Sequence, residues 1–270
     1  MLVGLPDAAV KESQQRIESA LRSAGLHWPG RQVVINMAPA DIRKEGSAYD
    51  LPLAVGIMVA SEMVKGSRLD GMLLTGELSL DGALRPVRGV LPMALRAREE
   101  GFRGMMVPAL NAPEAAVVEG IDIYGVNSLA EVLEYLHGDR TLAPVKVDLE
   151  ELFSREGNLY DTDFADVKGQ ENVKRALEVA VAGNHNAIMI GPPGSGKTML
   201  ARRLAGILPP LTLEEALETT MIHSVAGKTE NHIPLMTRRP FRSPHHTSSD
   251  ISLTGGGPVP QPGEISLAHN

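Results

Sequence analysis

The sequence predicts an α/β protein. Short apolar segments with the composition of strands alternate with longer segments whose apolar residues recur at helical spacing, a pattern typical of mixed α/β domains. A glycine-rich turn at residues 191–198 joins one predicted strand to the helix that follows, and the composition changes after residue 138. We therefore expect two domains, at residues 1–140 and 165–270, joined by a linker at 141–164.

The first domain is predicted to begin with a helix. Its apolar residues recur from Ala9 to Ala24, between Pro6, which is acceptable in a first turn, and Gly25, which favours a helix end. The next elements are a strand, an apolar helix, a second strand and a β-hairpin turn of Asp-Gly type, at residues 32–37, from 50 onward, 72–74 and 81–82.

The rest of this domain alternates between helix and strand. Helices are predicted at 90–100, after Pro113 and after Ser128, and strands at 105–107 and 121–126. In the last helix Ser128 is the expected N-cap, Glu131 its capping-box partner and Gly138 the stop. This ending marks the predicted domain limit.

The segment 141–164 is polar, acidic and weakly periodic, which is typical of a linker. Beyond it we expect a helix at 170–182, a strand at 187–190, a helix at 197–208 and a helix from Thr212 to Gly227, with Glu215 completing a capping box. After Lys228 the periodicity fades, so no element is predicted there.

Composition excludes several classes of protein. The 270 residues hold 26 Lys and Arg against 33 Asp and Glu, a net charge of −7, so contact with a polyanion must be local. The chain has no cysteine, which excludes disulfide scaffolds and cysteine-ligated metal sites. No apolar run reaches the roughly 18 residues of a membrane span, and no secretory signal is visible. We expect a cytoplasmic protein without a membrane partner.

The strongest motif is a phosphate-binding loop. Residues 191–198 fit the pattern G-x-x-x-x-G-K-[ST] in the required context between strand and helix. Lys197 is expected to reach the β- and γ-phosphates of ATP, and the Thr198 hydroxyl to hold Mg²⁺. The predicted nucleotide-binding residues are Gly191, Pro192, Pro193, Gly194, Ser195, Gly196, Lys197, Thr198 and Met199.

Further motifs carry a wider resemblance, which covers essentially the whole chain. They are Asp166-Val-Lys-Gly-Gln170, Lys174-Arg-Ala-Leu177, Gly183-Asn-His-Asn186, Ile207-Leu-Pro-Pro210, Arg239-Pro-Phe-Arg-Ser-Pro-His-His-Thr247 and Pro262-Gly-Glu-Ile-Ser-Leu-Ala-His-Asn270. With the phosphate loop, they resemble the AAA+ module of magnesium-chelatase-like ATPases, and within that group the YifB/ComM type.

The resemblance implies an ATP hydrolase that forms rings, with hexamers expected, and that acts on DNA during recombination in natural transformation. A magnesium-chelatase-like chaperone, which inserts a metal or remodels a protein, is the alternative. In the resembled family the Ser-Leu-Ala-His-Asn segment precedes the Walker B strand. This chain ends at Asn270, so it is expected to bind ATP without a complete hydrolytic site.

Residues 1–140 resemble the Lon-protease-like domain of the same family, an α+β domain related to the peptidase domain of Lon and to RadA. The matching stretches include Lys44-Glu-Gly46, Thr75-Gly-Glu77 and Arg85-Pro-Val87. The resemblance places Ala48 at the catalytic serine position and Met93 at the lysine position, so no peptidase activity is expected. Ser47 is the obvious objection, but no lysine lies near Met93 in sequence to serve it.

The last fifty residues hold five of the eight histidines and a short basic segment. The histidines show no ligand spacing, so structural or solvated roles are favoured over a metal site. Arg238, Arg239 and Arg242 are the candidate contacts to a DNA backbone. A loop that stabilises a neighbouring subunit through salt bridges is an equal alternative.

Overall fold

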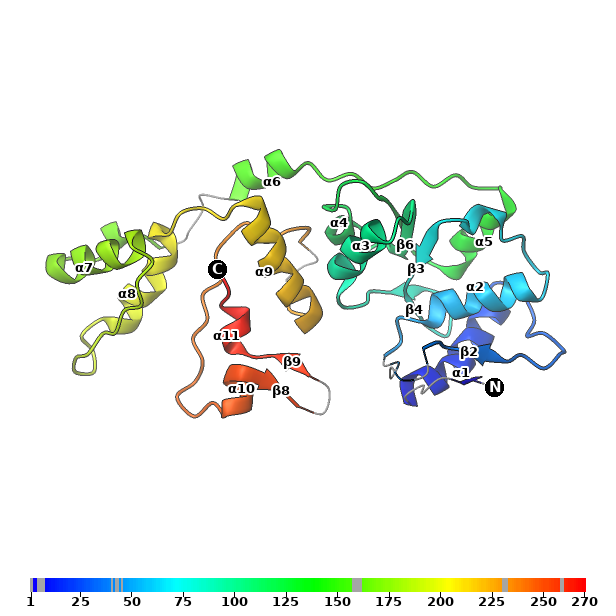
Figure 1. Ribbon diagram of the computed structural model, residues 1–270, viewed down its shortest axis with the longest axis horizontal. Coiled ribbons are helices and arrows are strands. Elements are labelled where there is room, and N and C mark those ends of the chain that lie inside the picture. Colours follow the sequence, from blue (N-terminus) through cyan, green and yellow to red (C-terminus); the bar gives the residue numbers. More distant parts are fainter. Residues whose placement is uncertain are drawn as a thin grey trace. The chain divides into compact units, whose positions relative to one another are not determined.

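The computed structural model describes residues 2–3, 8–39, 41, 44, 46–156, 162–229, 233–257 and 260–270. The chain divides into two compact units, Met1–Val147 with Thr229–Pro234, and Asp148–Lys228 with Leu235–Asn270. The division falls within the predicted linker 141–164. The exact limits of the two domains, at residues 140 and 165, stay a prediction. Pro6 lies outside the described residues. Both units mix helix and strand, as expected of an α/β chain (Figure 1).

The first unit carries most of the strands. In chain order its elements are β1 (Leu2–Val3), α1 (Ala8–Ser23), β2 (Ile35–Asn36), α2 (Asp50–Ala60), the 3₁₀ turn η1 (Ser67–Leu69), β3 (Met72–Leu74), β4 (Glu77–Leu78), β5 (Leu84–Arg85), α3 (Val90–Glu99), β6 (Gly104–Pro108), α4 (Ala112–Ala115), β7 (Asp122–Val126) and α5 (Leu129–His137). The predicted Asp81-Gly82 hairpin forms between β4 and β5, and Gly82 has the positive φ that such a turn needs.

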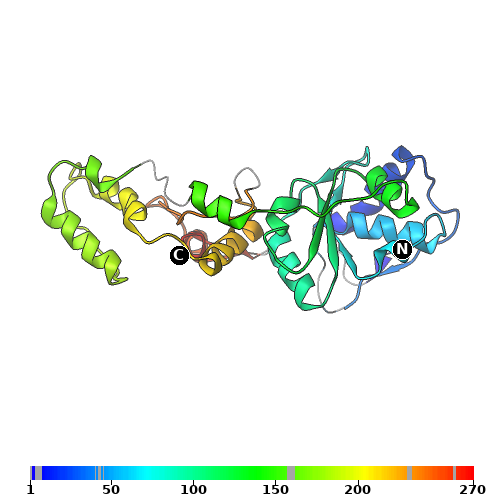
Figure 2. The same ribbon diagram turned by 90° about the horizontal axis from the view of Figure 1, so that it is seen from above.

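A parallel sheet of order β3-β6-β7 forms the centre of this unit. Every residue of β6 is buried, as expected of a parallel strand covered on both faces. Figure 2 shows the sheet between α3 and α4 on one side and α2 and α5 on the other. The core on the second side includes Met58 of α2, Met106 of β6 and Leu129 of α5.

A buried ion pair joins α1, α2 and β4. Arg16 Nε lies 2.6 Å from Asp50 Oδ2, and the same oxygen accepts a hydrogen bond from Leu78 N at 3.2 Å. The Asp50 side chain is fully buried. Burial raises the pKa of this carboxyl above its ordinary value, and the Arg16 hydrogen bond offsets only part of that effect. The amino end of α2 is therefore held by a charged contact that links three elements.

The second unit is mostly helical. It contains α6 (Leu149–Glu156), η2 (Phe164–Asp166), α7 (Glu171–Ala182), α8 (Lys197–Leu204), η3 (Ala205–Ile207), α9 (Leu213–Ala226), α10 (Asp250–Thr254), β8 (Gly255–Gly256), β9 (Gln261–Pro262) and α11 (Glu264–Leu267). The helices predicted at 170–182 and from 212 are confirmed, and so is the capping box of Thr212 and Glu215. The predicted helix 197–208 ends as α8 at Leu204 and continues as a 3₁₀ turn.

Five local expectations differ from the structure. Helix α6 forms inside the predicted linker, and α10 and α11 form where periodicity fades, because helices this short give little periodic signal. The Ser128 hydroxyl caps α5 as predicted, but the Glu131 carboxylate accepts from Asn127 N instead of Ser128 N. The strand predicted at 32–37 is only Ile35–Asn36. The strand predicted at 187–190 does not form.

Candidate nucleotide-binding site

The loop at residues 191–198 contains glycines in backbone conformations that other residues disfavour. Gly194 and Gly196 have φ values of 81° and 86°, in the left-handed region that side chains strongly disfavour. A Cβ atom on Gly191 would lie 3.0 Å from Ser195 Oγ, so a larger residue there would require the serine side chain to shift. Helix α8 begins directly after Gly196, and its free N–H groups and dipole favour an anion at this end.

The Lys197 side chain folds back and binds main-chain carbonyls of its own loop. Its Nζ atom donates hydrogen bonds to the carbonyl oxygens of Gly191 at 2.8 Å and Pro192 at 2.9 Å, and lies 3.3 Å from Ser195 Oγ. These acceptors are neutral, and phosphate oxygens form stronger bonds to an ammonium group. The lysine is therefore positioned at the loop and can exchange its carbonyl partners for a phosphate.

The loop is open to solvent. Residues 191–194 and Thr198 are exposed, and Met199 is 40% exposed at the start of the helix. Nothing lies within 4 Å of the position that a Gly194 Cβ would occupy. The donor set, made of main-chain amides, one ammonium and one hydroxyl, fits the triphosphate and Mg²⁺ of ATP.

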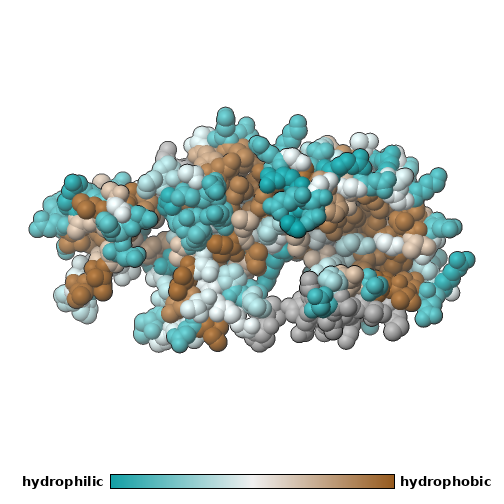
Figure 3. All heavy atoms as spheres, in the orientation of Figure 1, coloured by the Kyte–Doolittle hydropathy of each residue, from teal (hydrophilic) through white to brown (hydrophobic). Residues whose placement is uncertain are grey.

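The segment before the loop is extended but is not a strand. Met189 packs against the core of this unit, whereas Ile188 and Ile190 are 86% and 90% exposed. This alternation is that of a strand with one covered face. The strand prediction is wrong for this structure because no neighbouring strand pairs with residues 187–190 among the described residues. Figure 3 shows apolar surface at this loop before α8.

A small hydrophobic core holds the helix that follows the loop. Phe164, Val167, Leu177 and Leu200 bring together η2, α7 and α8. At the end of α8, Arg203 Nε donates to Asp163 O at 3.0 Å, which ties the helix to the segment before α7. Sequence reasoning missed Asp163, although its spacing to Asp166 is that of the capping box that the structure shows.

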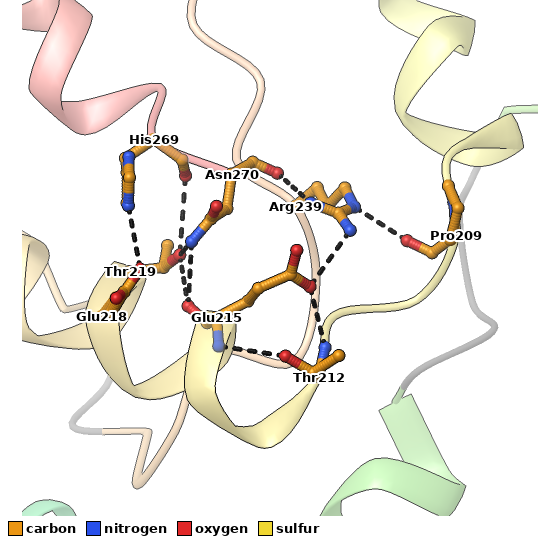
Figure 4. A network of polar contacts seen from close by, with 8 residues as sticks. All are labelled: Pro209, Thr212, Glu215, Glu218, Thr219, Arg239, His269 and Asn270. Atoms are coloured by element: carbon orange, nitrogen blue, oxygen red, sulfur yellow. Dashed lines mark hydrogen bonds and ion pairs between the residues drawn. The ribbon is translucent and has the colours of Figure 1, made fainter. Parts of the chain in front are cut away.

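Two of the three predicted DNA-contacting arginines are engaged within their own unit. Arg239 donates to Pro209 O at 2.7 Å and to Asn270 O at 2.6 Å, and lies 3.2 Å from Glu215 (Figure 4). Arg242 binds Glu264 through two bonds of 2.6 and 2.7 Å. Arg238 is half-buried and also has a partner. The structure thus gives these arginines intramolecular roles that the sequence did not predict.

Three of the five histidines in the last fifty residues are held by hydrogen bonds. His223 is buried with Nε2 at 3.1 Å from Leu267 O, His269 Nε2 lies 3.1 Å from Glu218 Oε2, and His245 Nδ1 lies 2.7 Å from Thr247 Oγ1. The ring centroids of His245 and His246 are 4.2 Å apart, and His232 lies outside the described residues. Within the described part of the chain, no three metal-binding side chains gather.

In the first unit, the predicted serine and lysine positions line one cavity. Ala48 and Met93 both contribute to its wall, together with Ser47 and Glu77. The Ser47 hydroxyl donates a hydrogen bond to the Glu77 carboxylate. Sequence reasoning missed this pairing because the two residues are thirty positions apart. No lysine or histidine is among the described residues that line the cavity.

Comparison with known proteins gives the family. A model described as "Magnesium chelatase, subunit ChlI" matches residues 163–270, and one described as "Subunit ChlI of Mg-chelatase" matches residues 1–111. The "Competence protein ComM" of Haemophilus influenzae is 42% identical over 269 residues, which cover 100% of this chain and 52% of that protein. The chain belongs to the YifB/ComM type of magnesium-chelatase-like proteins.

Two uncharacterized relatives show the same extent of match for this YifB/ComM-type chain. The protein YifB of Escherichia coli is 44% identical over 269 residues, covering 100% of this chain and 52% of YifB. A protein of Mycobacterium tuberculosis is 46% identical over 269 residues, covering 99% of this chain and 52% of the relative. The chain therefore spans about half the length of the curated relatives it matches.

More distant relatives match part of the chain. "Lon protease 2" of Bacillus subtilis is 29% identical over 125 residues, or 46% of this chain and 22% of that protein. The "DNA repair protein RadA" of Escherichia coli is 32% identical over 112 residues, or 42% of this chain and 24% of RadA. Among the helices that the structure describes, none is long and apolar enough to cross a membrane.

Proposed function

We propose that this chain is the ATP-binding part of a cytoplasmic AAA+ ATPase that acts on DNA. The observation that carries the proposal is the loop 191–198, with two left-handed glycines at the amino end of α8 and Lys197 Nζ at its centre. In the proposed assignment, residues 165–270 belong to an AAA+ module and residues 1–140 to a Lon-protease-like domain without peptidase function.

The proposed site binds ATP with Mg²⁺, which supplies charge neutralisation at the phosphates. The main-chain amides from Gly194 to Thr198 hold phosphate oxygens, and Lys197 exchanges its two carbonyl partners for them. The Thr198 hydroxyl lies at the start of α8, where it can coordinate the metal ion. Met199, exposed beside Gly196, borders the bound nucleotide.

Titration with a fluorescent ATP analogue tests the site. We expect saturable, magnesium-dependent binding that Lys197→Ala abolishes. Arg202→Ala is the matched control, because it removes a cation from an exposed position of the same helix outside the loop. Equal binding by Lys197→Ala and Arg202→Ala would show that the loop is not a nucleotide site.

The DNA part of the proposal rests on the ComM relative, whose name assigns it to competence, and on the basic segment of the second unit. Arg238, Arg239 and Arg242 remain the proposed contacts in a hexameric ring of the longer parent protein. For Arg239 and Arg242 this requires that Glu215 and Glu264 give way to phosphate oxygens.

A second candidate is a magnesium-chelatase-like chaperone that uses ATP to insert a metal or remodel a protein. The two ChlI family models favour it. ATP turnover by the longer parent protein separates the two candidates. Stimulation by DNA supports the DNA motor, and stimulation only by a partner protein supports the chaperone.

A further inference from the structure

The cavity of the first unit has the size of a ligand site. Its volume is about 650 Å³, and it is formed by the loop before α2, by β3, by the residues after β5 and by the first turn of α3. Its wall is largely apolar, with Ala48, Pro52, Leu73, Val87 and Met93 among the contributing residues. The space is large enough for side chains of a bound molecule.

One wall of the cavity is the open edge of a sheet. Strand β3 pairs with β6 alone among the described strands, so its other edge is uncovered there. Thr75 N donates to Met106 O at 3.1 Å, and main-chain groups alternate in direction along a strand. The N–H and C=O of Leu74 therefore point away from β6, and they have no hydrogen-bond partner within the described part of the chain.

Leu74 is half-buried, and an extended peptide supplies partners for the main-chain groups of an open strand edge by adding a strand. Every second side chain of such a peptide points into the cavity, and apolar side chains match its largely apolar wall. Arg88 is exposed at the rim and forms no ion pair with any residue that the structure describes, whereas Glu77 is engaged by Ser47. Glu77 keeps its negative charge in this hydrogen bond, so an acidic residue of the peptide is favoured beside Arg88 and not beside Glu77.

We propose that this cavity binds an extended peptide, with an apolar residue beside an acidic one, by strand addition to the free edge of β3. Ala48 and Met93 provide neither a nucleophile nor a base, and both leave room for the peptide side chain. The first unit thereby serves as a peptide-docking domain, independent of the nucleotide loop.

The probe is a fluorescein-labelled peptide of alternating Val and Asp residues, measured by fluorescence anisotropy with the full 270-residue chain. We expect saturable binding that weakens at least about tenfold when the peptide amides are N-methylated, because methylation removes pairing to β3. Met93→Trp fills the cavity and is expected to weaken binding at least about tenfold. Glu99→Trp adds the same ring near the exposed end of the same helix and is expected to bind as the parent does.

A charge exchange at the rim gives a second line of evidence that does not depend on filling the cavity. Arg88→Glu is expected to weaken binding of the Val-Asp peptide and to gain binding of a Val-Lys peptide. Equal binding of methylated and unmethylated peptides, or no saturable binding by the parent chain, would overturn the proposal. Lys197→Ala is expected to bind the peptide normally, so failure here is distinguishable from failure of the ATP site.

Discussion

At the scale of single residues, the glycines of the phosphate loop hold a conformation that other residues resist. Gly194 has φ of 81°, and a Cβ there would meet no atom within 4 Å. Glycine is therefore favoured at position 194 because another residue would strain the backbone, and not because a side chain would lack space. Gly56 in α2 has equal space and ordinary helical φ, which makes it a matched comparison.

We predict that Gly194→Ala distorts the loop at a cost of about 1–2 kcal/mol and weakens binding of the ATP analogue by about tenfold. Gly56→Ala should bind the analogue normally and should stabilise the first unit slightly, by about 0.5–1 kcal/mol. Fluorescence titration and thermal denaturation measure the two effects. Unchanged nucleotide affinity in Gly194→Ala would contradict the role of this glycine.

A second prediction at the scale of single residues concerns the ion pair between Arg242 and Glu264. The hydrogen bond from Arg242 lowers the pKa of the Glu264 carboxyl, and the same bond raises the pKa of Arg242. The folded state then binds fewer protons than the unfolded state at acidic pH, so the stabilisation is complete above the ordinary glutamate pKa. This stabilisation is lost as the pH falls through the lowered pKa of Glu264.

Arg242→Ala should therefore destabilise the protein at neutral pH and have a smaller effect near pH 3, roughly one unit below the ordinary glutamate pKa. Thermal denaturation of parent and variant at the two pH values measures this. Arg202→Ala, which removes an exposed cation, is the control. A destabilisation that does not depend on pH would show that the pairing contributes nothing.

At the scale of elements, α9 organises its half of the second unit through polar contacts. Thr219, Thr220, His223 and Ser224 are buried on this helix. The Thr220 hydroxyl donates to Ala216 O and accepts from Met236 N, and Asn270 Nδ2 lies 3.3 Å from Glu215 O. Figure 4 shows Arg239, His269 and Asn270 at the start of the helix, in contact with Glu215, Glu218 and Thr219.

We predict that Arg239→Ala lowers the free energy of unfolding by about 2 kcal/mol, because Glu215 and the Asn270 carbonyl lose a charged donor that is only 12% exposed. If Arg239 also contacts DNA in the longer parent protein, the slope of log affinity against log salt falls by about one. Denaturant titration and binding at several salt concentrations separate the effects. A stability loss with an unchanged slope would remove Arg239 from the DNA contacts.

The sequence predicts elements whose signals are local. The start of α9 follows from the spacing of Thr212 and Glu215, and the turn before α8 follows from its glycines, because both depend on neighbouring residues. The strand at 187–190 fails because a strand needs a hydrogen-bonded neighbour that local sequence does not specify. The pairing of Ser47 with Glu77 could not be predicted for the same reason, since only the tertiary fold joins them.

At the scale of the whole molecule, the first unit has a cavity lined by Ala48 and Met93, the two residues that the resemblance to Lon enzymes places at the positions of the reactive side chains. We predict no degradation of an unfolded casein-like substrate by this chain or by its longer parent. Gel analysis of the substrate with and without ATP measures this. Cleavage that disappears in Ser47→Ala, and persists in Ser79→Ala, would establish Ser47 as a nucleophile.

The exposed side chains of Ile188 and Ile190 have a practical consequence for handling this chain. An extended segment that exposes apolar side chains, and that pairs with no strand among the residues the structure describes, is a template for association between copies. The light scattered per unit concentration by solutions of the 270-residue chain should therefore rise with concentration. Ile188→Lys, which places a charge on the open side of the segment, should keep the chain dispersed without touching the phosphate loop.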